Sequence, residues 1–123
     1  MPGYAVKKID DMEAIYGGAY KRARAELGVT AFGMQVIDFP PNFEHYPEHD
    51  HGSDGQEEVY LALRGSAEFE LGDQRVLLVP GLAVRVAPET RRRLLPGPEG
   101  VRILVIGGVP GQAYERPGAF RLA

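Results

Sequence analysis

From Thr30 onward the chain alternates short apolar runs with glycine and proline turns, and this punctuation constrains the fold more than any other feature. About eight runs of strand-forming residues follow one another at regular spacing. Between the later runs there is no helical pattern of ten or more residues, which disfavours a fold of alternating strands and helices. The pattern predicts an all-β sandwich or barrel.

The composition narrows the class of protein further. The chain has 123 residues, of which 44% are hydrophobic and 25% charged, a balance typical of one soluble globular domain. A formal net charge of −3 disfavours a nucleic-acid or anionic-membrane surface. The absence of cysteine excludes disulfides and thiolate metal sites, and it suits the cytoplasm, which is the expected location. No apolar run suggests a membrane span or a signal peptide.

The chain is expected to form one domain over residues 1–123, in three parts. The last part is rich in glycine and proline, and its Tyr114 and Phe120 are candidates for packing against a partner subunit or across the barrel. The three parts are an N-terminal extension (1–29), a barrel core (about 30–107) and a C-terminal tail (108–123).

The N-terminal extension is the least strand-like part of the chain. An aspartate at the N-cap predicts a short helical turn over residues 12–16, which a pair of glycines ends. A second helical turn is predicted over residues 21–27, with Gly28 as its C-terminal stop. We therefore expect short helical turns at the N-terminal side of an otherwise all-β chain.

Alternation within the expected strands indicates which side chains face the interior. Phe32, Met34 and Val36 form a period-two set that is expected to belong to the core or to line its cavity. Tyr60 shares its parity with Glu58, so both are expected to face the barrel interior. Residues 45–51 also alternate and are expected to be extended. The other expected strands are residues 32–39, 58–63, 67–71, 75–79, 83–87, 91–95 and 101–106.

The three histidines of the chain, His45, His49 and His51, fall in one short window. His49 and His51 are two residues apart, so on a strand they point to the same face. With a carboxylate from the next strand they would form a two-histidine, one-carboxylate metal site with open positions. The alternative is a hydrophilic exposed loop over residues 48–55. Pro47 interrupts the run, which leaves His45 as a surface residue or an alternative ligand.

These residues resemble the first motif of the cupin superfamily, in which His-x-His is followed by glutamate and then glycine. Here His49 and His51 are followed by Glu58 and Gly65, and the six residues between Glu58 and Gly65 fit the motif. The six residues between His51 and Glu58 exceed the usual three or four. An enlarged turn at residues 52–55 would absorb the difference.

The second cupin motif is similar but altered. Residues 78–90 resemble its turn, strand and proline loop, and the family usually places a metal-binding histidine where this chain has Arg92. Arginine is always protonated and has no lone pair for a metal. Arg92 could point outward, pair with Glu58 in competition with a metal, or hold a substrate carboxylate or phosphate. Arg91 and Arg93 are expected on a solvated strand edge.

The resemblance covers residues 32–106 and implies a double-stranded β-helix, or jelly roll, often dimeric, with its site in the barrel mouth. It implies a divalent transition metal (Zn, Mn, Fe, Ni or Co) on His49, His51 and Glu58. Arg92 and Tyr60 are the candidate catalytic residues, which would orient a small-molecule ligand, and Gln56 is a polar candidate near the mouth.

Family members include dioxygenases, isomerases, sugar epimerases, decarboxylases and non-enzymatic binding domains, and the fold does not choose among them. The first hypothesis is a metal-dependent enzyme of oxygenase, isomerase or lyase type. The second is a non-enzymatic cupin that binds a small ligand and has a weakened metal site, and the third is a structural dimer module. The resemblance also predicts a homodimer.

Overall fold

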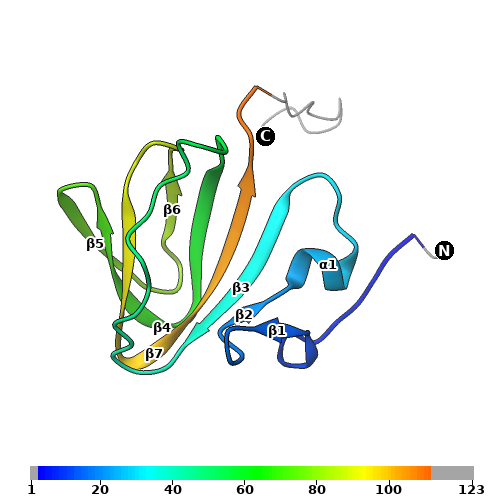
Figure 1. The fold of residues 1–123 in the computed structure, drawn as a ribbon. Coiled ribbons are helices and arrows are strands. Elements are labelled where there is room, and N and C mark those ends of the chain that lie inside the picture. The colour runs from blue at the N-terminus through cyan, green and yellow to red at the C-terminus, as the bar shows by residue number, and fades with distance from the viewer. Residues whose placement is uncertain (1–2, 112–123) are drawn as a thin grey trace.

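The computed structural model describes residues 3–111, which form an almost entirely antiparallel β-structure with one short α-helix (Figure 1). Seven strands form one sheet in the order β1-β2-β3-β7-β4-β5, and β6 also pairs with β4. The predicted all-β jelly roll is confirmed. Tyr114 and Phe120 lie outside the described residues. The strands are β1 (Ala14–Ile15), β2 (Tyr20–Lys21), β3 (Gly33–Phe39), β4 (Glu57–Leu71), β5 (Gln74–Leu78), β6 (Ala83–Val86) and β7 (Arg92–Gly108).

Two long strands, β4 and β7, replace four of the predicted short ones. β4 continues through Gly65, and β7 continues through residues 96–100, where the sequence predicts a turn and a loop. The pairing between them shifts register on both sides of Arg64 and Gly65, so the strands bend together without separating. Gly65 and Gly100 both have positive φ (72° and 74°), which lets the two backbones approach closely at this bend.

Strand β3 is buried on both of its faces. Ile37 and Phe39 face the barrel core, whereas Val36 packs outside it with Ala23 and Met12. Of the set predicted to belong to the core or to line its cavity, Val36 is buried, but in this outer cluster and not inside the barrel. Apolar residues occupy both parities of β3 because a second layer, α1 (Ala23–Leu27), covers its outer face. Phe32 is exposed, and Met34 packs against the outer cluster.

The N-terminal extension is part of the sheet. The helical turn predicted over residues 12–16 is wrong: a 3-10 turn forms at Ile9–Asp11, and β1 then pairs with β2 as a hairpin. β2 in turn pairs with β3, which gives the extended backbone hydrogen-bond partners that an isolated turn of helix lacks. The second predicted helical turn is confirmed in shorter form as α1, and Gly28 ends it in the left-handed conformation.

An ion-pair network fastens this extension to the barrel. Arg102 on β7 donates to both carboxylate oxygens of Asp38 on β3, at 2.7 and 2.9 Å, and also pairs with Asp10. Lys21 on β2 lies 3.7 Å from Asp38. The hairpin β1–β2 is thereby held beside the open end of the barrel, where the candidate site lies. Within residues 3–111 no helix is long and apolar enough to cross a membrane.

Candidate metal centre in the barrel mouth

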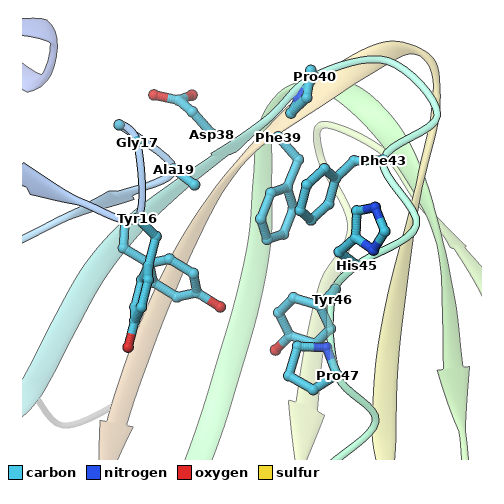
Figure 2. A pocket seen from close by; sticks show the side chains of 12 residues that line it. Tyr16, Gly17, Ala19, Asp38, Phe39, Pro40, Phe43, His45, Tyr46 and Pro47 are labelled. Carbon is cyan, nitrogen blue, oxygen red and sulfur yellow. The ribbon is translucent and has the colours of Figure 1, made fainter.

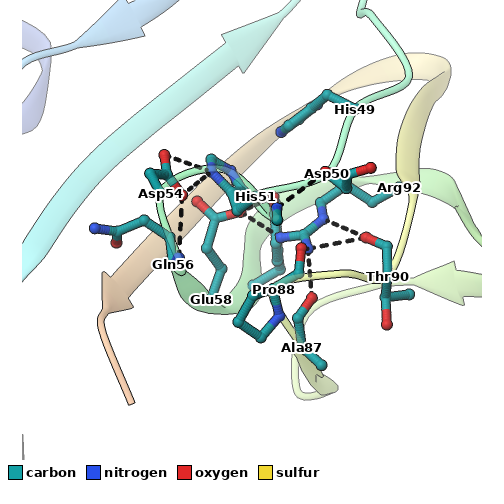
Figure 3. Close-up of polar contacts among 12 residues, drawn as sticks. His49, Asp50, His51, Asp54, Gln56, Glu58, Ala87, Pro88, Thr90 and Arg92 are labelled. Atoms are coloured by element: carbon teal, nitrogen blue, oxygen red, sulfur yellow. Dashed lines mark hydrogen bonds and ion pairs between the residues drawn. The ribbon is translucent and has the colours of Figure 1, made fainter. Parts of the chain in front are cut away.

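The structure brings His49, His51 and Glu58 together. Their donor atoms all lie within 4.8 Å of one another (Figure 3). Glu58 is fixed by β4, between β6 and β7, and its side chain is buried as the strand parity predicts. His45 does not join them: it is exposed, and its ring meets Phe43 edge-on at 5.4 Å.

The two histidines are carried by a loop, not by a regular strand. The predicted extended run over residues 45–51 is reduced to one isolated bridge between His49 and Arg92. There the amide of His49 donates to the carbonyl of Arg92 at 3.0 Å, and the amide of Arg92 donates back at 2.8 Å. The amide of His51 donates to the carbonyl of Pro88 at 2.7 Å. Backbone hydrogen bonds to the second-motif segment thus position both imidazoles.

Both imidazoles have an acceptor at Nδ1. His49 Nδ1 lies 3.1 Å from the carbonyl oxygen of Pro47, and His51 Nδ1 lies 3.1 Å from both carboxylate oxygens of Asp54. An acceptor at Nδ1 holds the proton there and leaves the Nε2 lone pair for a metal. The same contact lowers the pKa of Asp54, because its hydrogen bond with His51 favours the carboxylate. The ring orientations are therefore those that metal-binding histidines require.

Arg92 turns inward and pairs with Glu58. Its side chain is 0% exposed, and its Nη1 donates to Glu58 Oε1 at 2.8 Å. Its Nη2 and Nε donate to backbone carbonyls, at 2.6 Å from Ala87 and at 2.9 and 3.2 Å from Thr90. Of the three orientations that the sequence leaves open, the structure thus has the one that pairs with Glu58. Arg91 and Arg93 face solvent more openly and pair with acidic residues at the surface.

The carboxylate of Glu58 uses one oxygen for all its contacts with described residues. Oε1 accepts from the Tyr60 hydroxyl at 2.6 Å and from Arg92, and it lies 3.2 Å from His51 Nε2. Oε2 has none of these contacts, which leaves it as the oxygen available to an ion. Two imidazole nitrogens and one carboxylate oxygen suit Zn, Mn, Fe, Ni or Co, so the residues present fit such an ion.

Two buried tyrosines lie behind this site. Burial, with the neighbouring Tyr46 and Glu58, raises the pKa of Tyr60 well above its usual value. Burial also raises the pKa of Tyr46, whose ring packs against His49 at 5.5 Å. Both hydroxyls therefore stay protonated in the folded protein over the whole neutral range. Tyr60 points into the barrel as predicted, and its hydroxyl serves as a donor to Glu58.

These pKa shifts predict alkaline instability. A raised folded-state pKa means that the contribution of Tyr46 and Tyr60 is complete below pH 10 and is lost as the pH rises further, because the unfolded chain releases protons that the fold retains. Each tyrosine should lower the free energy of unfolding by about 1.4 kcal/mol per pH unit above pH 10. Urea melts at pH 9 to 11 measure this slope. The Tyr60→Phe variant should show a shallower slope, and equal slopes would contradict the prediction.

The open side of the site is a pocket of about 330 Å³. Gln35 on β3 and Tyr20 on β2 are among its lining residues that were not predicted from the sequence. The parity of Gln35 with the buried Ile37 and Phe39 is the signal that could have found it. Gln56 lines an adjoining pocket of about 310 Å³ that also includes His51. The lining residues of the first pocket are Ile15, Tyr16, Tyr20, Gln35, Tyr46, Pro47, His49, His51, Glu58 and Tyr60.

No protein-family model matches the sequence, and no curated protein matches it. The structure is similar to solved cupins. A cupin protein (BF4112) from Bacteroides fragilis matches with a TM-score of 0.76 and 18% identity, over 95% of this chain and 93% of that one. The DMSP lyase DddQ from Ruegeria pomeroyi matches with a TM-score of 0.57 and 25% identity, over 68% of this chain and 41% of that one.

A third similar structure is FeII HppE, with a TM-score of 0.55 and 14% identity over 63% of this chain and 43% of that one. This chain therefore spans less than half the length of DddQ and of HppE, but almost the whole of the Bacteroides cupin. The likeness is one of fold, and it agrees with the motif around His49, His51 and Glu58. The chain is a cupin-fold protein.

Proposed function

We propose that this protein binds a divalent first-row transition metal through His49, His51 and Glu58, and that it transforms a small molecule in the barrel mouth. The observation that carries the proposal is the preset state of both imidazoles: each Nδ1 has an acceptor, and the donor atoms of the three residues converge. Histidines in an ordinary surface loop are not expected to have both rings fixed by an acceptor at Nδ1. The lyase and the Fe(II) protein with similar folds support the same kind of chemistry.

The residues around the ligands have positioning roles in this proposal. Tyr60 and Arg92 hold Glu58 through Oε1 and leave Oε2 without a hydrogen bond to them, while Asp54 and Pro47 orient the imidazoles. Arg92 is enclosed, so in this proposal it acts through Glu58 and does not itself contact substrate. When bound, the metal would supply Lewis-acid polarisation of a substrate oxygen. Lyase and isomerase reactions use that chemistry, whereas an oxygenase would need the metal to bind dioxygen.

A non-enzymatic ligand-binding cupin is the second candidate, and one observation favours it. The Arg92 guanidinium lies 2.8 Å from Glu58 at the position where cupins usually have a fourth ligand. Its charge offsets that of the carboxylate and weakens the attraction for a cation. Turnover of a substrate separates this candidate from an enzyme. The homodimer and the cytoplasmic location expected from the sequence stay predictions.

Metal content tests the proposal directly. Untagged protein that has been incubated with Mn, Fe, Co, Ni or Zn and then desalted should retain one of these ions stoichiometrically. His49→Ala, His51→Ala and Glu58→Ala should each lose it, because two protein ligands rarely retain an ion through desalting. His45→Ala is the matched control, since that imidazole is exposed and outside the cluster, and it should retain the ion. Folded wild-type protein that retains none of the five ions would refute a metal centre.

A further inference from the structure

A second and larger cavity, of about 770 Å³, adjoins the candidate metal centre. It lies between the turn of the β1–β2 hairpin and the segment that follows β3 (Figure 2). Four residues line both this cavity and the metal pocket, so the two spaces are neighbours: Tyr16, Tyr20, Tyr46 and Pro47. A molecule bound to the metal therefore lies beside the larger space, which we call the aromatic annex.

Aromatic rings form both sides of the annex. On one side Phe39 and Phe43 stack at 4.8 Å with their planes 9° apart, and Tyr46 meets Phe39 edge-on at 5.6 Å. On the other side Tyr16 meets Tyr20 edge-on at 5.3 Å. Figure 2 shows Tyr16 on one side and Phe39, Phe43 and Tyr46 on the other. The two sides meet where Tyr20 contacts Phe39 edge-on at 6.1 Å. Walls of this kind favour a flat, apolar occupant, because rings gain from stacked and edge-on contacts beyond their burial.

Tyr16 is an unusual residue in this wall. Its side chain is 77% exposed, and its backbone has a positive φ of 54°. A large aromatic side chain in the left-handed region is costly and is typical of functional sites. The two glycines that follow also have positive φ. The turn that these residues form places the Tyr16 ring in the lining of both the annex and the metal pocket. A ligand in the annex would cover the ring.

The charges of the two spaces differ. The annex carboxylate, Asp38, is already paired with Arg102 at 2.7 Å and with Lys21 at 3.7 Å, so the annex does not select a cation. In the metal pocket, Arg92 offsets Glu58, and both histidines are neutral ligands. A bound divalent ion would keep most of its positive charge there. An anionic, oxygen-donating group is the ligand that such an ion attracts.

We propose that the substrate has an anionic chelating head for the metal and a planar aromatic body that lies in the aromatic annex. The inference rests on the metal site proposed above and adds the class of molecule that it takes. The annex supplies the selectivity for the body, and the metal pocket supplies the selectivity for the head. Pockets of several hundred cubic ångströms commonly bury a ligand of this size.

Two hydroxamates of different size test the proposal by calorimetry on Zn-loaded protein. Acetohydroxamate carries the chelating head alone, whereas 3-phenylpropanohydroxamate has the same head and an aromatic ring on a two-carbon linker. The aryl compound should bind at least about tenfold more tightly, as expected when one aromatic ring is buried. Phe43→Ala should reduce this ratio several-fold and leave acetohydroxamate binding unchanged, because Phe43 lines the annex and not the metal pocket. Tyr16→Ala should also reduce the ratio. Leu77→Ala, an exposed change on β5, should leave both affinities unchanged.

The outcomes separate the two proposals. If both hydroxamates bind equally, or if the ratio survives in both annex variants, the aromatic annex is not a substrate site although the metal site stands. If the protein takes up no ion and binds neither compound, both proposals fail. Tyr16→Ala guards against a folding artefact, because removal of so exposed a ring does not open the core. Binding measurements need no knowledge of the reaction.

Discussion

Replacing Arg92 with methionine is expected to lower the free energy of unfolding by about 3 to 5 kcal/mol, the cost of breaking a buried ion pair by removing one partner. The variant leaves the Glu58 carboxylate without the donor that lies 2.8 Å away. It also removes the donors to the carbonyls of Ala87 and Thr90, which hold the second-motif loop. Urea or thermal denaturation measures the loss.

Added metal should partly reverse this loss. Without the guanidinium, no fixed positive charge lies beside Glu58, so a divalent ion at His49, His51 and Glu58 should raise the melting temperature more in Arg92→Met than in the wild type. Arg93→Met is the matched control. The side chain of Arg93 is 40% exposed, and its ion pair with Glu70 is a long one, at 4.0 Å. The free energy of unfolding of this variant should therefore change by less than about 0.5 kcal/mol. A stable Arg92→Met protein without metal would show that the ion pair adds nothing to the fold.

Gly65→Ala is expected to destabilise the barrel by at least about 3 kcal/mol, from strain and overpacking together. A β-carbon at Gly65 would lie 2.1 Å from the carbonyl oxygen of Gly100 and 3.0 Å from the backbone of Val101. These are backbone atoms of the paired strand and cannot rotate away. The positive φ of 72° adds conformational strain for any L side chain. Chemical denaturation, or loss of soluble protein on expression, measures the effect.

Gly72→Ala separates the two causes. Gly72 has a similar φ of 60°, but nothing lies within 4 Å of the position of its β-carbon. This variant should therefore show the conformational strain alone, about 1 kcal/mol. If both variants lost the same stability, the close approach of β4 and β7 at Gly65 would be without consequence.

The sequence predicts the barrel well and its long strands poorly. Glycine and proline punctuation places most strand positions correctly, because such residues are common wherever a chain turns. At Gly65 and at residues 96–100 the same residues lie in bends of continuous strands. That the backbone stays extended at these positions is evident only from the pairing of β4 with β7. The face on which Val36 lies could not be predicted for a similar reason. Both faces of β3 are covered, so the alternation of apolar residues does not tell which face lies inside the barrel.

The site was predictable in its ligands and not in its surroundings. Period-two histidines and the spacing from Glu58 to Gly65 identify the cluster, because a strand repeats its faces every two residues. The acceptors of the imidazoles, Asp54 and Pro47, depend on the path of a loop that follows no repeat. For Arg92 the motif gives the position, but its inward turn depends on the carbonyls that surround it.

Strand β7 has a consequence for how the protein is made. It lies between β3 and β4, and residues 101–107 pair with residues 33–39 across most of the chain. While a ribosome is still translating the first ninety or so residues, neither β3 nor β4 has its shared neighbour, and the barrel cannot close. The nascent chain then carries unpaired strand edges and exposed apolar side chains. A chain in this state is prone to aggregate through these edges until strand β7 has been made.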